Sequence, residues 1–143
     1  MIYKKSWKYI LIKQNTFDPY YRLKAIKDFS DVKRRDFGGY VSNYHNLSQE
    51  GECWIYDEVL VTKNAEVSGN AKIFGNAHID DNAKVSGNAI IYQHPFIFDN
   101  AKVYGNAVIS GRAQIFENAQ VYGNAIISGN TKVSENTCIS RLL

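Results

Sequence analysis

The sequence predicts an all-β protein in which short parallel strands stack as a solenoid. A six-residue unit of the form Gly-Asn-Ala-x-(Val/Ile)-x fills residues 51–140 without a gap and is repeated fifteen times. The fifth position of every unit is Val or Ile, and the third position is mostly Ala. Because side chains alternate along a strand, these two positions share one face and form the core. Gly-Asn supplies the corner, since both residues tolerate left-handed backbone angles.

The chain is expected to divide into a cap at residues 1–50, a solenoid at residues 51–140 and a short tail at residues 141–143. The cap is basic, with ten Lys or Arg against five Asp or Glu, whereas the remainder carries seven against nine. Within the cap, the stretches Lys8–Lys13 and Tyr21–Lys27 are typical of strands on either side of a turn. We expect this hairpin to cover the open first coil.

The repeat resembles the hexapeptide-repeat, left-handed parallel β-helix family. That resemblance implies triangular coils of three hexads, and therefore a left-handed β-helix of five complete coils. Residues 22–32, 36–41 and 46–56 further resemble a phage and prophage group of these proteins. That group carries an acyltransferase label that is inherited from the fold, so the label says little about chemistry.

If each coil holds three hexads, every third hexad lies in one column and each column forms one outer face. The first column is mostly apolar, which predicts that something covers it. We expect self-association into a homotrimer, as in many relatives of this fold. The expected interface residues are Trp54, Tyr56, Phe74, Ile90, Tyr92, Val108 and Ile126.

The repeat departs most clearly from its consensus at Gln93-His94-Pro95, and one coil further on Arg112 replaces the corner Asn. His94 and Arg112 are therefore expected in one corner, beside aromatic side chains. A cation, an imidazole and several rings suit an anionic, ring-containing ligand such as a nucleotide. The candidate ligand-binding residues are His78, Tyr92, His94, Phe96, Phe98, Arg112, Gln114 and Phe116. The competing interpretation is a solvated corner beside a purely structural ladder of rings.

Three functions remain open from the sequence. The leading hypothesis is a non-catalytic, homo-oligomeric binder of a small anionic ligand at subunit edges. In the phage setting that the resemblance suggests, this binder would sequester a host signal. The first alternative is an acyltransferase with His94 as its base, although the hexads run without the inserted loop that such enzymes often carry. The second alternative is a structural or protein-binding solenoid.

No metal or cofactor is expected. The γ-class carbonic anhydrases share the fold that the resemblance implies and hold zinc with three histidines, of which two are a few positions apart. The chain has only His45, His78 and His94, and no two of them are close in sequence, so their spacing does not match. Cys53 and Cys138 lie in the first and last hexads, too far apart for the Cα separation of about 7 Å that a disulfide tolerates.

The expected location is the cytoplasm, without membrane contact. The opening Met1–Lys8 lacks the apolar core of a secretion signal, and no later apolar run is long enough to span a membrane. Nucleic-acid binding is not expected from the one basic triplet, Lys33-Arg34-Arg35. Such binding favours a wider basic stripe with interleaved aromatic residues.

Overall fold

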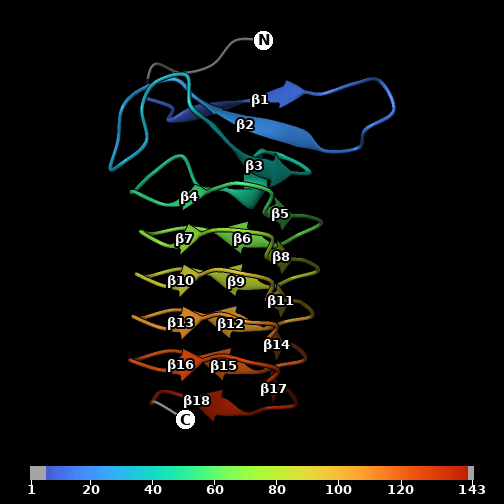
Figure 1. Ribbon diagram of the computed structural model, residues 1–143, viewed down its shortest axis with the longest axis vertical. Coiled ribbons are helices and arrows are strands. Elements are labelled where there is room, and N and C mark those ends of the chain that lie inside the picture. The colour runs from blue at the N-terminus through green and yellow to red at the C-terminus, as the bar shows by residue number, and fades with distance from the viewer. Residues whose placement is uncertain (1–5, 142–143) are drawn as a thin grey trace.

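A computed structural model describes residues 6–141 as a stack of similar coils with a cap at its N-terminal end (Figure 1). Of the predicted tail, residues 142–143 lie outside the described residues. Each coil contains three two-residue strands joined by corners. The strands are β4 (Trp54–Ile55), β5 (Leu60–Val61), β6 (Glu66–Val67), β7 (Lys72–Ile73), β8 (His78–Ile79), β9 (Lys84–Val85), β10 (Ile90–Ile91), β11 (Phe96–Ile97), β12 (Lys102–Val103), β13 (Val108–Ile109), β14 (Gln114–Ile115), β15 (Gln120–Val121), β16 (Ile126–Ile127), β17 (Lys132–Val133) and β18 (Cys138–Ile139). The predicted parallel β-solenoid is therefore confirmed.

Each strand of the stack pairs in parallel with the strand three hexads further along the chain, which confirms three hexads per coil. Ile91, for example, is in register with Ile73 of the coil before and Ile109 of the coil after. This pairing produces three sheets along the stack: β4-β7-β10-β13-β16, β6-β9-β12-β15-β18, and a third that contains β5-β8-β11-β14-β17. We call the outer surfaces of the sheets that contain β4, β5 and β6 the first, second and third faces.

The interior of the stack consists of the predicted Val, Ile and Ala columns. The Val or Ile of each of the first fourteen hexads is buried, and Ile139 of the last hexad is partly buried. The Ala residues, such as Ala89 and Ala107, are fully buried beside them. Each strand of the first four coils also donates backbone hydrogen bonds to the next coil, as from the Ile90 N–H to the Ala107 carbonyl at 2.9 Å. Burial and main-chain pairing therefore repeat together once per coil.

The cap contains β1 (Tyr9–Lys13), β2 (Tyr21–Ala25), β3 (Phe37–Val41) and the 3₁₀-helix η1 (Tyr44–Asn46). β1 and β2 form the predicted antiparallel hairpin, and β3 pairs antiparallel with β2. β3 also pairs in parallel with β5, so the cap strands and the strands of the second face form one eight-stranded sheet. The stacked arrangement thus begins before the first hexad. η1 is the one helix among residues 6–141, and none there is long and apolar enough to cross a membrane.

Two structural features attach the cap closely to the first coil. A Cβ atom at Gly38 or Gly39 would lie 2.6 Å from the backbone oxygen of Ile55 or Val59, so only glycine allows this approach. The buried Lys8 ammonium donates hydrogen bonds to the carbonyl oxygens of Glu50, Gly51 and Cys53 at 3.3, 3.2 and 2.8 Å, around the start of the first hexad. Burial lowers the pKa of Lys8. Both cysteines are free thiols.

The corner glycines give a direct test of how closely the coils stack. Gly105 and Gly129 both have positive φ, at 65° and 63°. A Cβ atom at Gly105 would lie 2.7 Å from the Gly123 nitrogen, whereas a Cβ atom at Gly129 would meet nothing within 4 Å. Gly105→Ala should therefore lower the free energy of unfolding by about 1–3 kcal/mol more than Gly129→Ala does. Gly129→Ala carries only the cost of a left-handed backbone conformation. Urea unfolding of both variants measures this difference, and equal losses would contradict the described coil contact.

Candidate functional site

The exposed part of the first face is an apolar, uncharged strip on β10, β13 and β16. Ile90, Tyr92 and Ile126 are 41%, 40% and 44% exposed, and Val108 lies between them, partly buried. The outward positions of these three strands and of the residues that follow them are Ile90, Tyr92, Val108, Ser110, Ile126 and Ser128. None is charged. We call this set the apolar strip.

The first two coils of the same face do not belong to that strip, because the cap covers much of them. Trp54 is 1% exposed and packs edge-on against Phe29, with ring centroids 5.3 Å apart. The prediction that Trp54 lies in an exposed interface is therefore wrong. The Tyr56 hydroxyl donates a 2.6 Å hydrogen bond to Asp31 of the cap, and this bond lowers the pKa of Asp31. Tyr56 also stacks on Phe74 at 4.2 Å, and both rings are partly buried.

His94 and Arg112 lie on adjacent coils at the corner between the first and second faces, as predicted. The backbone N–H of His94 donates a 2.9 Å hydrogen bond to the backbone carbonyl of Gly111, which holds the two corners next to each other. Both side chains are exposed, and within residues 6–141 neither makes a hydrogen bond or ion pair. The corner therefore presents an unpaired guanidinium and an imidazole to solvent.

The second face carries the predicted aromatic residues as a continuous stack. His78 lies parallel to Phe96 with centroids 4.9 Å apart, and Phe98 lies parallel to Phe116 at 5.0 Å. Phe96 and Phe98 connect the two pairs at 4.3 Å. The rings use most of their faces on one another, which favours the structural-ladder interpretation.

His78 also belongs to a polar cluster at one end of this stack. Its Nε2 lies 3.4 Å from the Thr62 hydroxyl and 3.9 Å from an Asp80 carboxylate oxygen. Burial lowers the pKa of His78, although Asp80 opposes that shift, so the imidazole is neutral at neutral pH. Burial of Asp80 favours its neutral form, but hydrogen bonds from Thr62 and the Asp81 N–H hold the pKa of Asp80 below its usual value.

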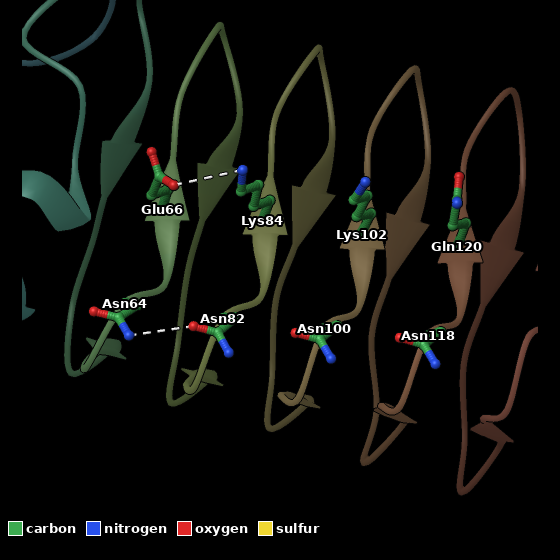
Figure 2. A pocket seen from close by; sticks show the side chains of 8 residues that line it. All are labelled: Asn64, Glu66, Asn82, Lys84, Asn100, Lys102, Asn118 and Gln120. Atoms are coloured by element: carbon green, nitrogen blue, oxygen red, sulfur yellow. Dashed lines mark hydrogen bonds and ion pairs between the residues drawn. The ribbon is translucent and has the colours of Figure 1, made fainter.

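Two hollows lie elsewhere, beside the third face. One of them is a groove of about 540 Å³. Figure 2 shows a row of Asn side chains along one side of this groove and a row of charged and polar side chains along the other. Its lining residues are Asn64, Glu66, Asn82, Lys84, Asn100, Lys102, Asn118 and Gln120. Glu66 and Lys84 form an ion pair at 3.7 Å, whereas Lys102 has no ion-pair partner within residues 6–141.

Acidic residues occupy the corner beside this groove, where the other corners mostly use glycine. Asp81, Asp99, Glu117 and Glu135 all have positive φ, and each of the first three accepts a hydrogen bond from the backbone N–H one coil on, at 3.0–3.1 Å. Sequence reasoning missed this corner, although every third hexad from Lys63 onward lacks the initial glycine. Within residues 6–141, no three His, Cys, Asp or Glu side chains are placed to hold a metal ion.

The fold and its repeat define a class of protein, the hexapeptide-repeat β-solenoids. Residues 119–135 match a family model described as YdcK Beta solenoid repeat. A segment of 49 residues is 43% identical to the protein named Uncharacterized acetyltransferase YdcK from Escherichia coli (strain K12), and it covers 34% of this chain but 15% of that protein. Both matches support the predicted relationship to the hexapeptide-repeat β-helix family, and neither bears on the phage group.

Proposed function

We propose that the protein is a non-catalytic homotrimer that packs through the apolar strip and binds a small anionic ligand at the rim of that contact. The observation that carries this proposal is the strip itself. Ile90 and Tyr92 of one coil and Ile126 two coils further on are exposed, with the partly buried Val108 between them and no charged residue at the outward positions. The depletion of charge and the presence of an aromatic residue are typical of the core of a protein interface. The number of subunits follows the resemblance to trimeric relatives.

The rim is where the ligand would bind, because Tyr92 of the strip directly precedes the corner of His94 and Arg112. Arg112 is exposed and has no carboxylate partner among the described residues, so its guanidinium is free to pair with a phosphate or carboxylate in two-point geometry. Packing of a second subunit on the strip would supply the wall that this corner lacks in one subunit. Three equivalent sites would follow from a trimer. A nucleotide-like ligand and a counter-defence role in phage rest on the resemblance alone.

Native mass spectrometry of gently purified protein tests the rim site. The wild type should carry a small-molecule adduct that denaturation releases, or should take one up from a panel of nucleoside phosphates. Arg112→Ala should bind the same ligand at least about tenfold more weakly, which is the effect expected from removing a charge-assisted pair. Lys102→Ala, which removes another exposed cation from the third face, should keep it. An adduct that persists in Arg112→Ala would retire the rim site.

Acyl transfer is the second candidate, favoured by the name of the YdcK protein and by one observation in this chain. The imidazole of His94, the predicted base, is exposed and has no partner among the described residues, whereas the imidazole of His78 contacts Thr62 and approaches Asp80. A neutral imidazole in such a cluster is able to accept a proton. Consumption of acetyl-coenzyme A that His78→Ala abolishes and His94→Ala leaves intact would favour this candidate over ligand binding alone.

A further inference from the structure

The outward side of the cap sheet gathers cations and aromatic rings that are distant in sequence. Leu23 and Ala25 of β2 are buried, so the alternating residues Arg22 and Lys24 lie on the opposite, outward side. Lys24 is in register with Phe37 of β3, and Arg22 with Tyr40. A register shift between these two pairs leaves Phe37 and Tyr40 on the same side of β3, since it adds a residue to that strand. Two cations therefore lie beside two rings.

These groups are in contact rather than merely adjacent. The Arg22 guanidinium carbon lies 5.0 Å from the Phe37 ring centroid and 5.4 Å from that of Tyr40. The Lys24 ammonium lies 5.6 Å from the Phe37 centroid. Phe37 is nevertheless 50% exposed, so part of its ring remains open. Such cation–ring contacts keep the rings and the charges at the surface together.

Two further cations extend this group at the end of β2. The Arg35 N–H donates a 2.9 Å hydrogen bond to the Ala25 carbonyl, which brings Arg34 and Arg35 beside Lys24. A hollow of about 180 Å³ lies between them, lined by Ile10, Lys24, Ala25, Ile26, Arg34 and Arg35. We define the cap patch as Arg22, Lys24, Arg34, Arg35, Phe37 and Tyr40.

The positive charge of the cap patch is not neutralised by the protein. Among residues 6–141, none of its four cations forms an ion pair. The acidic residues of the neighbouring loop have other partners. Asp28 and Asp36 accept hydrogen bonds from the backbone N–H groups of Arg34 and Lys33, and Asp31 is held by Tyr56 on the first face. The four cations of the patch are therefore free to pair with an external anion.

We propose that the cap patch binds single-stranded nucleic acid. Surfaces that bind single strands combine a stripe of cations, which contacts the phosphates, with aromatic rings on which bases stack. The basic triplet at residues 33–35 supplies cations but no rings. In the folded sheet, Arg22 and Lys24 add further cations, and Phe37 and Tyr40 supply the rings. The cations are spread over β2 and the following loop, which suits a chain of phosphates better than one small anion.

The surroundings of the patch favour a nucleic acid over a lipid surface. Among the large apolar side chains of residues 6–141, the most exposed, Phe17 at 94%, lies in the loop between β1 and β2. This loop adjoins Lys13 and Tyr21, at the opposite end of the hairpin from Ala25 and the two arginines. Phe17 therefore lies apart from Lys24, Arg34 and Arg35, whereas membrane-surface segments combine cations with strongly exposed apolar side chains along one face. In addition, Tyr40 pairs with Leu60, so the patch continues directly onto the second face.

Fluorescence anisotropy of a labelled oligothymidylate with the full chain at low salt tests this proposal. Binding should weaken at least tenfold in K24Q/R34Q/R35Q. The slope of log K against log salt concentration should become shallower by about 0.7 per lost phosphate contact. The matched control K84Q/K102Q/R141Q removes the same charge away from the cap and should bind like the wild type. Phe37→Ser should weaken oligothymidylate but leave inorganic polyphosphate unaffected, because only the former offers bases to stack.

Three results would overturn the proposal: no binding of oligothymidylate at low salt, equal loss in the control triple variant, or binding of polyphosphate as tight as that of oligothymidylate. Binding of vesicles with anionic headgroups in the absence of oligothymidylate binding would assign the patch to lipid instead. The oligomeric state of each variant is measured separately. A failure at the cap patch is thereby distinguished from a failure of trimer packing or of the rim site.

Discussion

Replacing Trp54 with Ala should loosen the cap from the first coil and lower the free energy of unfolding by about 3–5 kcal/mol, the usual cost of truncating a buried tryptophan. The ring is 1% exposed and packs against Phe29 and Tyr9 of the cap. It also lies under Gly38, where a Cβ atom would approach it to 2.7 Å. Its loss leaves a cavity that the surrounding backbone cannot close easily.

Urea unfolding followed by circular dichroism measures this loss. Tyr122→Ala is the matched control, because Tyr122 is an aromatic residue of the repeat that stacks on Tyr104 at 5.1 Å but remains partly exposed. Its truncation should cost about 0.5–1.5 kcal/mol from the ring pair, together with a smaller loss of buried area. If the two variants lose the same stability, Trp54 does not anchor the cap.

Replacing both Ile90 and Ile126 with Glu should convert the assembled protein to monomers. Each side chain is more than two-fifths exposed in one subunit, so the fold tolerates the change. In a packed interface, however, each carboxylate would be desolvated without a partner, at a cost of several kcal/mol. Size-exclusion chromatography with light scattering gives the mass of the double variant. Ser86→Glu with Gln120→Glu adds the same charge to the third face and should leave the assembly intact. Retention of the assembly by the Ile90/Ile126 variant would place the interface elsewhere.

The solenoid itself was predictable because one local pattern determines both its strands and its stacking. The Val or Ile at the fifth position defines the buried face, and the constant unit length keeps every coil in register. β3 was not predictable in the same way. Its Gly38-Gly39 lacks an alternating pattern, and the separation of Tyr40 from its partner Leu60 is not a whole number of hexads. The left-handed sense of the coil comes from the family resemblance alone.

The candidate sites were predictable only within the repeat, where every third hexad lies in the same column. Counting in steps of three hexads places His94 beside Arg112 and identifies the aromatic ladder. It also shows the apolar strip, but it does not show that the cap loop covers Trp54, because that contact joins unrelated parts of the chain. The cap patch was hidden for the same reason. Arg22 meets Phe37 and Tyr40 only after β2 and β3 pair with a register shift.

The mass of the unmodified protein in solution decides whether the apolar strip is an interface between subunits. Light scattering at micromolar concentration should give three times the mass of one chain, since the apolar strip is uncharged over three coils and the cap does not cover it. A mass of one chain under these conditions would contradict the account. The strip would then be an exposed face of a monomer, and the corner of His94 and Arg112 would have no second subunit to complete it.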